Sequence, residues 1–441
     1  MLLKIICLPS RLAFIGNLNT FGEFIKVCNG RCFHTKYLLE NSVCSKTHLI
    51  NVRNFCKQSE TDDKNITKSV HTSHAKELLD SLSVQDELNS SVPNPDHDWA
   101  TLPYPENALP NVFRDQALRS VRPKVDPRET SIILFPGQGT QFVGMGQDLV
   151  KFPIARDLFE AASEILGYNL MKLCLKGPKE QLDRTEFCQP AVLVCSLAAV
   201  EKLKEERPSA VENCVATAGF SVGEISALVF AGALQFERAV RLVNVRAEAM
   251  QLASEVSPGG MMTVWYGPDS QLGYACLQAR EWCKERGIED PECAVANYLY
   301  PHCKVIAGHI EALKFIETNI AKFKLRRVRS LPVSGAFHSN LMRPAVPVFM
   351  KALRKANIDD PVISVHSNLD GKRYRNSDHI ARQLPRQIWK PVKWEQTLHA
   401  IYERSVGERF PKTFECGPGQ SLKSVLKMVN AKAWDSCISV G

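Results

Sequence analysis

The sequence predicts an α/β protein in which a smaller unit is inserted into a larger one. From Ser131 to Leu252, short apolar runs alternate with segments of helical spacing. This alternation is typical of a parallel sheet covered by helices on both faces. Over residues 258–333 the order becomes strand, helix, two strands, helix and strand, which is the order of a ferredoxin-like unit. The first pattern resumes at Ser334, so we expect a large domain of residues 129–257 and 334–441 around a small domain of residues 258–333.

The larger unit begins with a buried strand, Ser131–Phe135, because five largely apolar residues end at Pro136-Gly137. Proline favours the first turn of a helix, so Pro190 is expected to open one. The other expected elements are helices at Ile154–Leu166, Pro190–Leu203, Ser221–Phe230 and Phe236–Leu252, and strands at Cys214–Ala218, Val362–Ser367 and Thr413–Glu415.

The smaller unit follows the turn Ser257-Pro258-Gly259-Gly260. Its expected strands are Met261–Tyr266, Glu292–Asn297, Cys303–Ala307 and Lys324–Pro332, and its expected helices are Ser270–Arg286 and Glu311–Phe323.

Composition excludes several classes of protein. The chain has 441 residues, 44% of them hydrophobic and 23% charged, as in an ordinary globular protein. No apolar run is long enough for a membrane span. The net charge of +8 is not gathered into a basic stripe with aromatic residues, so nucleic-acid binding is not expected. The 15 cysteines are scattered without a CxxC pair, which argues against a disulfide framework and against structural zinc.

The N-terminal residues 1–50 are apolar and basic, with six basic and two acidic side chains. The basic residues are spread between apolar ones, as on an amphipathic helix, rather than placed before one compact apolar block. We therefore expect a mitochondrial transit peptide and a matrix location, rather than a secretory signal or an untargeted tail. Residues 51–128 are polar and proline-rich, and predict a linker with one short helix near His74–Leu82.

The segment Gly219-Phe220-Ser221-Val222-Gly223 is a GxSxG pattern between an expected strand and an expected helix. A serine at such a sharp turn points outward, and the glycines leave room for neighbouring backbone. The helix start supplies free N–H groups that favour an oxyanion. In this setting Ser221 is predicted to be a nucleophile rather than a chance match.

A serine nucleophile needs a base, and His338 is the candidate. It lies in the small-residue loop Ser334–Ser339, where the smaller unit rejoins the larger one. Alone, such a histidine is more often structural. Only its combination with Ser221 favours catalysis.

One further loop and one further residue allow either a functional or a structural interpretation. The glycine-rich loop Phe135–Gln141 is either a tight turn or a source of a backbone N–H that joins that of Val222 in an oxyanion hole. Arg246 is either an exposed arginine or a buried clamp for a carboxylate.

Four segments in this order resemble the malonyl-CoA:acyl carrier protein transacylase family. They are FPGQGTQ, GFSVGE, RAEAMQ and GAFHS, and a later segment, ECGPGQSL at Glu415–Leu422, resembles the family's C-terminal glycine turn. The resemblance covers residues 130–441. It implies an α/β-hydrolase-like large domain with an inserted ferredoxin-like small domain.

The resemblance also implies residue roles. Ser221 would carry the acyl group, and His338 would act as general base and then as general acid. Arg246 would bind the malonyl carboxylate. The sequence Ala336-Phe337-His338 fits the malonyl-specific members of the family. Backbone N–H groups of Gln138 and Val222 would form the oxyanion hole, and the backbone carbonyl of Gln387 would orient the histidine.

One departure from the family is Phe220, where many members have histidine. Because the expected base is His338, this difference does not put activity in doubt. The implied reaction is a ping-pong transfer of malonyl from malonyl-CoA to holo acyl carrier protein for fatty-acid synthesis. Both thiol carriers are substrates, so no resident cofactor and no metal are expected. The oligomeric state is open, with a monomer the expectation.

Two rival functions remain at this point: a serine esterase or thioesterase, and a non-catalytic scaffold that binds carrier protein or RNA. The basic segment KFKLRRVR at Lys322–Arg329 is either a dock for the acidic carrier protein or a solvated strand edge.

Overall fold

The computed structural model describes residues 126–405 and 407–441. The transit peptide, almost all of the linker and the short helix near His74–Leu82 therefore lie outside the described residues.

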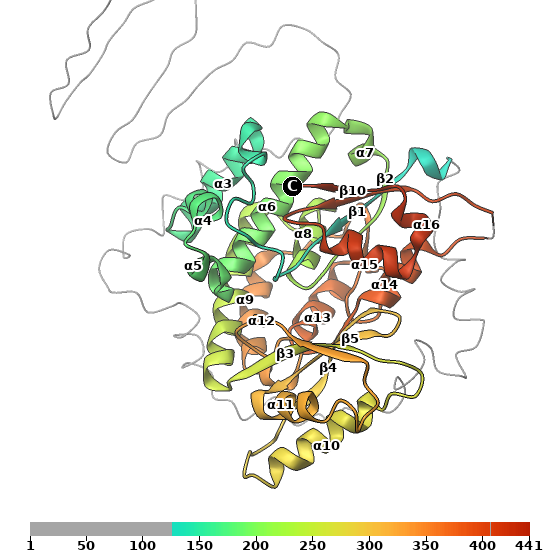
Figure 1. Ribbon diagram of the computed structural model, residues 1–441. Coiled ribbons are helices and arrows are strands. Elements are labelled where there is room, and N and C mark those ends of the chain that lie inside the picture. The colour runs from blue at the N-terminus through green and yellow to red at the C-terminus, as the bar shows by residue number, and fades with distance from the viewer. Residues whose placement is uncertain (1–125, 406) are drawn as a thin grey trace, which may run out of the picture. The chain divides into compact units, whose positions relative to one another are not determined.

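Five parallel strands form the first sheet, in the order β10-β9-β1-β2-β7 (Figure 1). The strands are β1 (Ser131–Phe135), β2 (Cys214–Gly219), β7 (Ser364–His366), β9 (Lys412–Cys416) and β10 (Cys437–Val440). Every residue of β1 is buried, which explains its uninterrupted apolar run: a central parallel strand faces packed helices on both sides.

Helices cover both faces of this sheet. On one face Ile133 and Phe135 share a core with α3 (Pro153–Leu166), α6 (Thr185–Glu206), α8 (Val222–Phe230), α9 (Phe236–Val256) and α12 (Ala345–Ala356). On the other face Ile132 and Leu134 pack with α14 (Trp394–Tyr402), α15 (Ser421–Val429) and α16 (Ala431–Trp434). The observed architecture is thus an α/β fold with a parallel sheet.

Shorter helices complete this part of the chain. They are α4 (Leu170–Lys176), α5 (Lys179–Asp183), α7 (Pro208–Glu212), α13 (Ser377–Gln387) and the 3-10 turns η3 (Pro127–Glu129), η4 (Leu149–Lys151) and η5 (Asn340–Met342).

The second sheet has the order β6-β3-β5-β4-β8. Its elements are β3 (Gly259–Trp265), α10 (Leu272–Lys284), β4 (Cys293–Tyr300), β5 (Cys303–His309), α11 (Ile310–Thr318), β6 (Arg327–Ser330) and β8 (Val392–Lys393). The first four strands in this order pair antiparallel, whereas β4 and β8 pair parallel. Helices α10 and α11 pack on one face, and residues of the other face, such as Val305 and Ala307, join the core of the first sheet.

Most elements expected between residues 131 and 330 are confirmed, with shifted ends. The expectation that Pro190 opens a helix is wrong, because α6 begins at Thr185 and contains Pro190. Proline deprives the helix of one N–H bond there. The turn before it is nevertheless helical because Thr185, Cys188 and Gln189 are buried against the rest of the fold.

Two helix ends and the placement of one strand also differ from the expectation. Helix α11 stops at Thr318 rather than Phe323. The Asn319 side chain donates to the carbonyl of Phe315 and so ends the series of backbone hydrogen bonds in the helix. Helix α9 continues four residues further, to Val256. Strand β8 joins the second sheet although it lies outside residues 258–333.

The turn after β2 packs directly against the loop after β1. The Phe220 N–H donates to the carbonyl of Phe135 over 2.9 Å. A Cβ on Gly223 would lie 2.4 Å from the carbonyl oxygen of Phe135 and 2.6 Å from that of Pro136. A Cβ on Gly137 would lie 2.4 Å from the carbonyl oxygen of Phe220. The two glycines therefore permit a backbone approach that no other residue allows.

We predict that Gly223→Ala lowers the free energy of unfolding by about 2 kcal/mol or more, because backbone oxygens cannot rotate away from the added methyl group. Gly260→Ala is the matched control, since its methyl group would meet only a flexible methyl of Leu313 at 3.3 Å. Urea denaturation of both variants measures the difference. Equal midpoints for the two variants would contradict the close packing of the turn.

Candidate active site

Ser221 lies between β2 and α8 in a strained backbone conformation, with φ 55° and ψ −112°. Such a conformation is rare for a residue with a Cβ and persists only where surrounding contacts hold it. The side-chain oxygen of Asn368 accepts the Ser221 N–H at 2.7 Å, and the Gln387 side-chain amide donates to the Ser221 carbonyl at 2.7 Å. The hydroxyl therefore has a fixed position beside the start of α8.

His338 contacts the serine hydroxyl directly. Its Nε2 lies 2.9 Å from Ser221 Oγ, and its Nδ1 lies 2.7 Å from the backbone carbonyl of Gln387. A carbonyl only accepts, so Nδ1 carries the proton and Nε2 is free to accept one. Burial, with the nearby Arg246 cation, lowers the pKa of His338 to about 4. The imidazole is therefore neutral at neutral pH and able to act as a base.

Arg246 is a buried cation, with 1% of its surface exposed. Its Nη2 donates to Ser221 Oγ at 3.1 Å and to Gln387 Oε1 at 3.0 Å, and its Nη1 donates to Gln189 Oε1 at 2.5 Å. None of the ion pairs within 4 Å among the described residues involves it. Burial lowers the pKa of Arg246 to about 10, so the guanidinium remains charged at neutral pH.

The loop that contains Gln138 lies beside the serine turn. Gly137 contacts the Phe220 carbonyl, and Val222 is the first residue of α8, where backbone N–H groups have no acceptor within the helix. The Gln138 side chain accepts from Gln189 at 3.3 Å, which connects this loop to the partner of Arg246.

The remaining site candidate, Phe337, directly precedes His338 and is buried in the main hydrophobic core. The structure therefore brings Ser221, His338, Arg246 and Gln387 into one hydrogen-bonded cluster. The basic segment 322–329 lies elsewhere, in and before the edge strand β6.

The sequence did not single out a buried polar network beneath this cluster. Glu224 accepts from the Tyr374 hydroxyl at 2.5 Å, from the Asn368 N–H at 3.2 Å and from the Gln387 amide at 2.9 Å. It is completely buried, and burial raises its pKa to about 7. One sequence signal could have identified it: Glu224 is the only charged residue in the apolar stretch Val222–Phe230.

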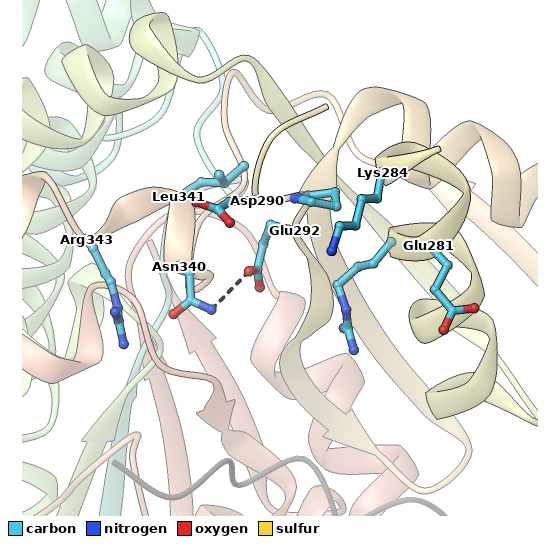
Figure 2. A pocket seen from close by; sticks show the side chains of 9 residues that line it. Glu281, Lys284, Asp290, Glu292, Asn340, Leu341 and Arg343 are labelled. Carbon is cyan, nitrogen blue, oxygen red and sulfur yellow. Dashed lines mark hydrogen bonds between the residues drawn. The ribbon is translucent and has the colours of Figure 1, made fainter. Parts of the chain in front are cut away.

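A cavity of about 560 Å³ opens beside η5, close to the loop that carries His338. Figure 2 shows it between α10 and η5, with the Asn340 amide donating to Glu292 at 3.0 Å. Basic and acidic side chains line it together, and Ser221, His338 and Arg246 are not among them.

Within residues 126–405 and 407–441, no three side chains of histidine, cysteine, aspartate or glutamate are grouped as metal ligands. Over the same residues, no helix is long and apolar enough to cross a membrane.

Residues 132–409 match the acyl transferase domain family. The chain is 59% identical over 319 residues to the probable malonyl-CoA-acyl carrier protein transacylase, mitochondrial, of Drosophila melanogaster, with 72% of this chain and 84% of that protein covered. It is 55% identical over 314 residues to the malonyl-CoA-acyl carrier protein transacylase, mitochondrial, of Homo sapiens, with 71% and 80% covered.

A solved structure is also similar. The malonyl-CoA:acyl carrier protein transacylase of Xanthomonas oryzae pv. oryzae superposes with a TM-score of 0.64 at 30% identity, covering 71% of this chain and 94% of that one. The family resemblance of the sequence segments is confirmed. The chain belongs to the acyl transferase domain family and, within it, to the malonyl-CoA-acyl carrier protein transacylases.

Proposed function

We propose that this protein transfers malonyl groups from malonyl-CoA to the phosphopantetheine thiol of holo acyl carrier protein, for mitochondrial fatty-acid synthesis. The observation that carries the proposal is a buried guanidinium, that of Arg246, 3.1 Å from the hydroxyl of Ser221. A nucleophile beside a buried cation favours acyl groups that end in a carboxylate. The names of the similar transacylases from Drosophila melanogaster and Homo sapiens support the same donor and acceptor.

In the first half-reaction, Ser221 Oγ attacks the thioester carbonyl of malonyl-CoA while His338 Nε2 takes the hydroxyl proton. The tetrahedral intermediate collapses, the C–S bond breaks, and His338 returns the proton to the departing CoA thiolate. The product is malonyl bound to Ser221 as an ester. Because the pKa of His338 is held near 4, the base is available throughout the neutral range.

In the second half-reaction the carrier protein's thiol attacks the ester. His338 takes the thiol proton and passes it to Ser221 Oγ as the ester bond breaks, which restores the free enzyme. We assign the oxyanion hole to the backbone N–H groups of Gln138 and Val222. The Ser221 N–H is bonded to Asn368, so it is not available for this purpose. CoA and phosphopantetheine are substrates in this scheme, and no resident cofactor is proposed.

Arg246 would clamp the free carboxylate of the malonyl group. Its present partners Gln189, Gln387 and Ser221 are neutral, so its charge is not balanced by direct contact. A carboxylate bound there would form charge-assisted hydrogen bonds in a site of low dielectric constant. Phe337, packed beside the base, would limit the space for substituents on the acyl chain.

We further propose that the first sheet and its helices form an α/β-hydrolase-like large domain, residues 129–257 and 334–441. The support is the strand-turn-helix placement of Ser221 at the C-terminal end of β2. Residues 258–333 would form a ferredoxin-like small domain, supported by the antiparallel strand order β6-β3-β5-β4 with α10 and α11 on one face.

The protein is mitochondrial, as the names of the animal relatives indicate. We propose that residues 1–50 direct it to the matrix and that residues 51–128 are a linker.

The carrier protein would dock on the basic segment at the edge of the second sheet. Five cationic side chains there are exposed, namely Lys322, Lys324, Arg326, Arg327 and Arg329. Strand β6 is the last strand of the sheet, so these charges face solvent rather than another strand. An acidic partner would gain both orientation and association rate from such a patch.

We predict that Ser221→Ala abolishes the malonyl-enzyme adduct, because no other group in the site is placed as the nucleophile. Intact-protein mass spectrometry after incubation with malonyl-CoA measures the adduct. The control is Ser226→Ala on α8. The Ser226 hydroxyl has no hydrogen-bond partner among the described residues, so this variant should form the adduct as the wild type does. Labelling of Ser221→Ala would eliminate Ser221 as the acyl carrier.

We predict that Arg246→Ala lowers kcat/KM for malonyl transfer by about a hundredfold or more while sparing or raising acetyl transfer. Arg241→Ala, on the exposed side of the same helix, is the control and should leave both rates unchanged. Transfer from malonyl-CoA and acetyl-CoA to holo carrier protein provides the measurement. An equal fall for both acyl groups would refute the clamp and leave an unselective esterase or thioesterase as the better description. Absence of transfer by the wild type would favour a non-catalytic scaffold.

We predict that the double change Arg327→Glu and Arg329→Glu raises KM for the carrier protein about tenfold at low salt, because it reverses the charge of the dock. The KM for malonyl-CoA should not change. The control for net charge is Lys427→Glu with Lys432→Glu, at exposed lysines on α15 and α16, because it changes the net charge by the same amount. If the control raises KM as much as the double variant, the dock is not at β6.

A further inference from the structure

Gln387 contacts the nucleophile, the base and the cation of the proposed site. Its backbone carbonyl accepts from His338 Nδ1, and its side-chain oxygen accepts from Arg246. Its side-chain nitrogen donates to the Ser221 carbonyl and, at 2.9 Å, to a carboxylate oxygen of Glu224. The base, the cation and the nucleophile are therefore all positioned relative to one glutamine.

The orientation of the Gln387 amide is decided by the charges on its two sides. The oxygen faces the Arg246 guanidinium, and the NH₂ group faces the Glu224 carboxylate and the Ser221 carbonyl. A flipped amide would turn its NH₂ group toward a cation and its oxygen toward an anion and a carbonyl. The carboxylate of Glu224, together with the Arg246 cation and the Ser221 carbonyl, therefore selects one of the two amide orientations.

Glu224 is itself held by three residues, two in the loop between β7 and α13 and one at the end of α13. One oxygen accepts from the Tyr374 hydroxyl and the Asn368 N–H, and the other accepts from Gln387. The Asn368 side chain also bonds the Ser221 N–H and, at 2.7 Å, the Gly219 carbonyl, so the same network supports the strained serine turn. All of these residues are buried.

The geometry points to Glu224 as a positioning residue: its carboxylate fixes the Gln387 side-chain amide, and through it the place of Arg246 and of the Ser221 carbonyl. This inference rests on the proposed function. Glu224 touches no substrate in this scheme and acts through Gln387.

An isosteric change tests the role. Glu224→Gln replaces one acceptor oxygen by an NH₂ group of almost the same size. If that group faces Gln387, two NH₂ groups oppose each other. If it faces the other way, it opposes the Asn368 N–H, which cannot accept. Either orientation breaks a contact that the carboxylate makes.

The experiment compares Glu224→Gln with Glu415→Gln, Gln387→Ala and the double variant Glu224→Gln with Gln387→Ala. Glu415 is the matched control, since it is also fully buried and burial raises its pKa to about 7, but its partners are the backbone N–H groups of Leu422 and Lys423. Two rates are measured: kcat for malonyl transfer, and inactivation by a fluorophosphonate probe. The probe reacts with an activated serine whatever the natural acyl group is.

We expect Glu224→Gln to lower kcat and the rate of probe labelling, each by about a hundredfold, with KM for the carrier protein unchanged. Glu415→Gln should leave both rates at the wild-type level. The double variant should be no slower than Gln387→Ala, because a residue that acts through another adds nothing once that residue is gone.

Two results would overturn the inference. One is a Glu224→Gln variant whose rate of probe labelling and whose kcat for malonyl transfer both equal those of the wild type. The other is a double variant whose loss is the product of the two single losses, which would mean that Glu224 acts independently of Gln387. A wild type that labels with the probe but transfers no malonyl would instead refute the proposed function, while the comparison of labelling rates would still test Glu224.

Discussion

The strained backbone of Ser221 is the constraint on which the rest of the site depends. A positive φ at a residue with a Cβ costs about 1–3 kcal/mol and must be held in place by its surroundings. Here the surroundings come from distant parts of the chain: Asn368 bonds the N–H, Gln387 bonds the carbonyl, and the loop after β1 packs against the turn at Gly223. Because β1, β2 and β7 are neighbouring parallel strands, the segments that follow them meet at one edge of the sheet, where such contacts are possible.

Charge separation is the second feature of the site. Arg246 and Glu224 are both buried, yet they are connected by the Gln387 amide rather than by direct contact. Burial lowers the pKa of Arg246 to about 10 and raises the pKa of Glu224 to about 7. For each side chain, burial therefore disfavours the charged form more than the neighbouring groups favour it. A direct ion pair would neutralise Arg246 permanently. The intervening amide leaves the guanidinium charge available for a substrate carboxylate, which fits an enzyme that selects a charged acyl group.

The sequence predicted those parts of the fold that have strong local signals. Strand β1 is an uninterrupted apolar run that ends at Pro136, and its bounds agree with the structure. The start of α6 was missed because buried contacts extended the helix on the N-terminal side of Pro190. Strands β8 and β10 were not expected. Strand β8 has only two residues, which are too few to establish a period.

The same distinction applies to the site. Ser221 and His338 stand in recognisable local patterns, but Arg246 lies on a helix of mixed polarity whose sequence does not reveal burial. Glu224 differs from both. A carboxylate in an apolar helix cannot be left without donors, so the sequence alone requires that Glu224 be paired. It cannot name the partners, since Asn368, Tyr374 and Gln387 are 144, 150 and 163 residues away. Physical reasoning on a sequence can therefore identify a buried charge that needs partners, whereas only the folded chain identifies the glutamine through which that charge would act.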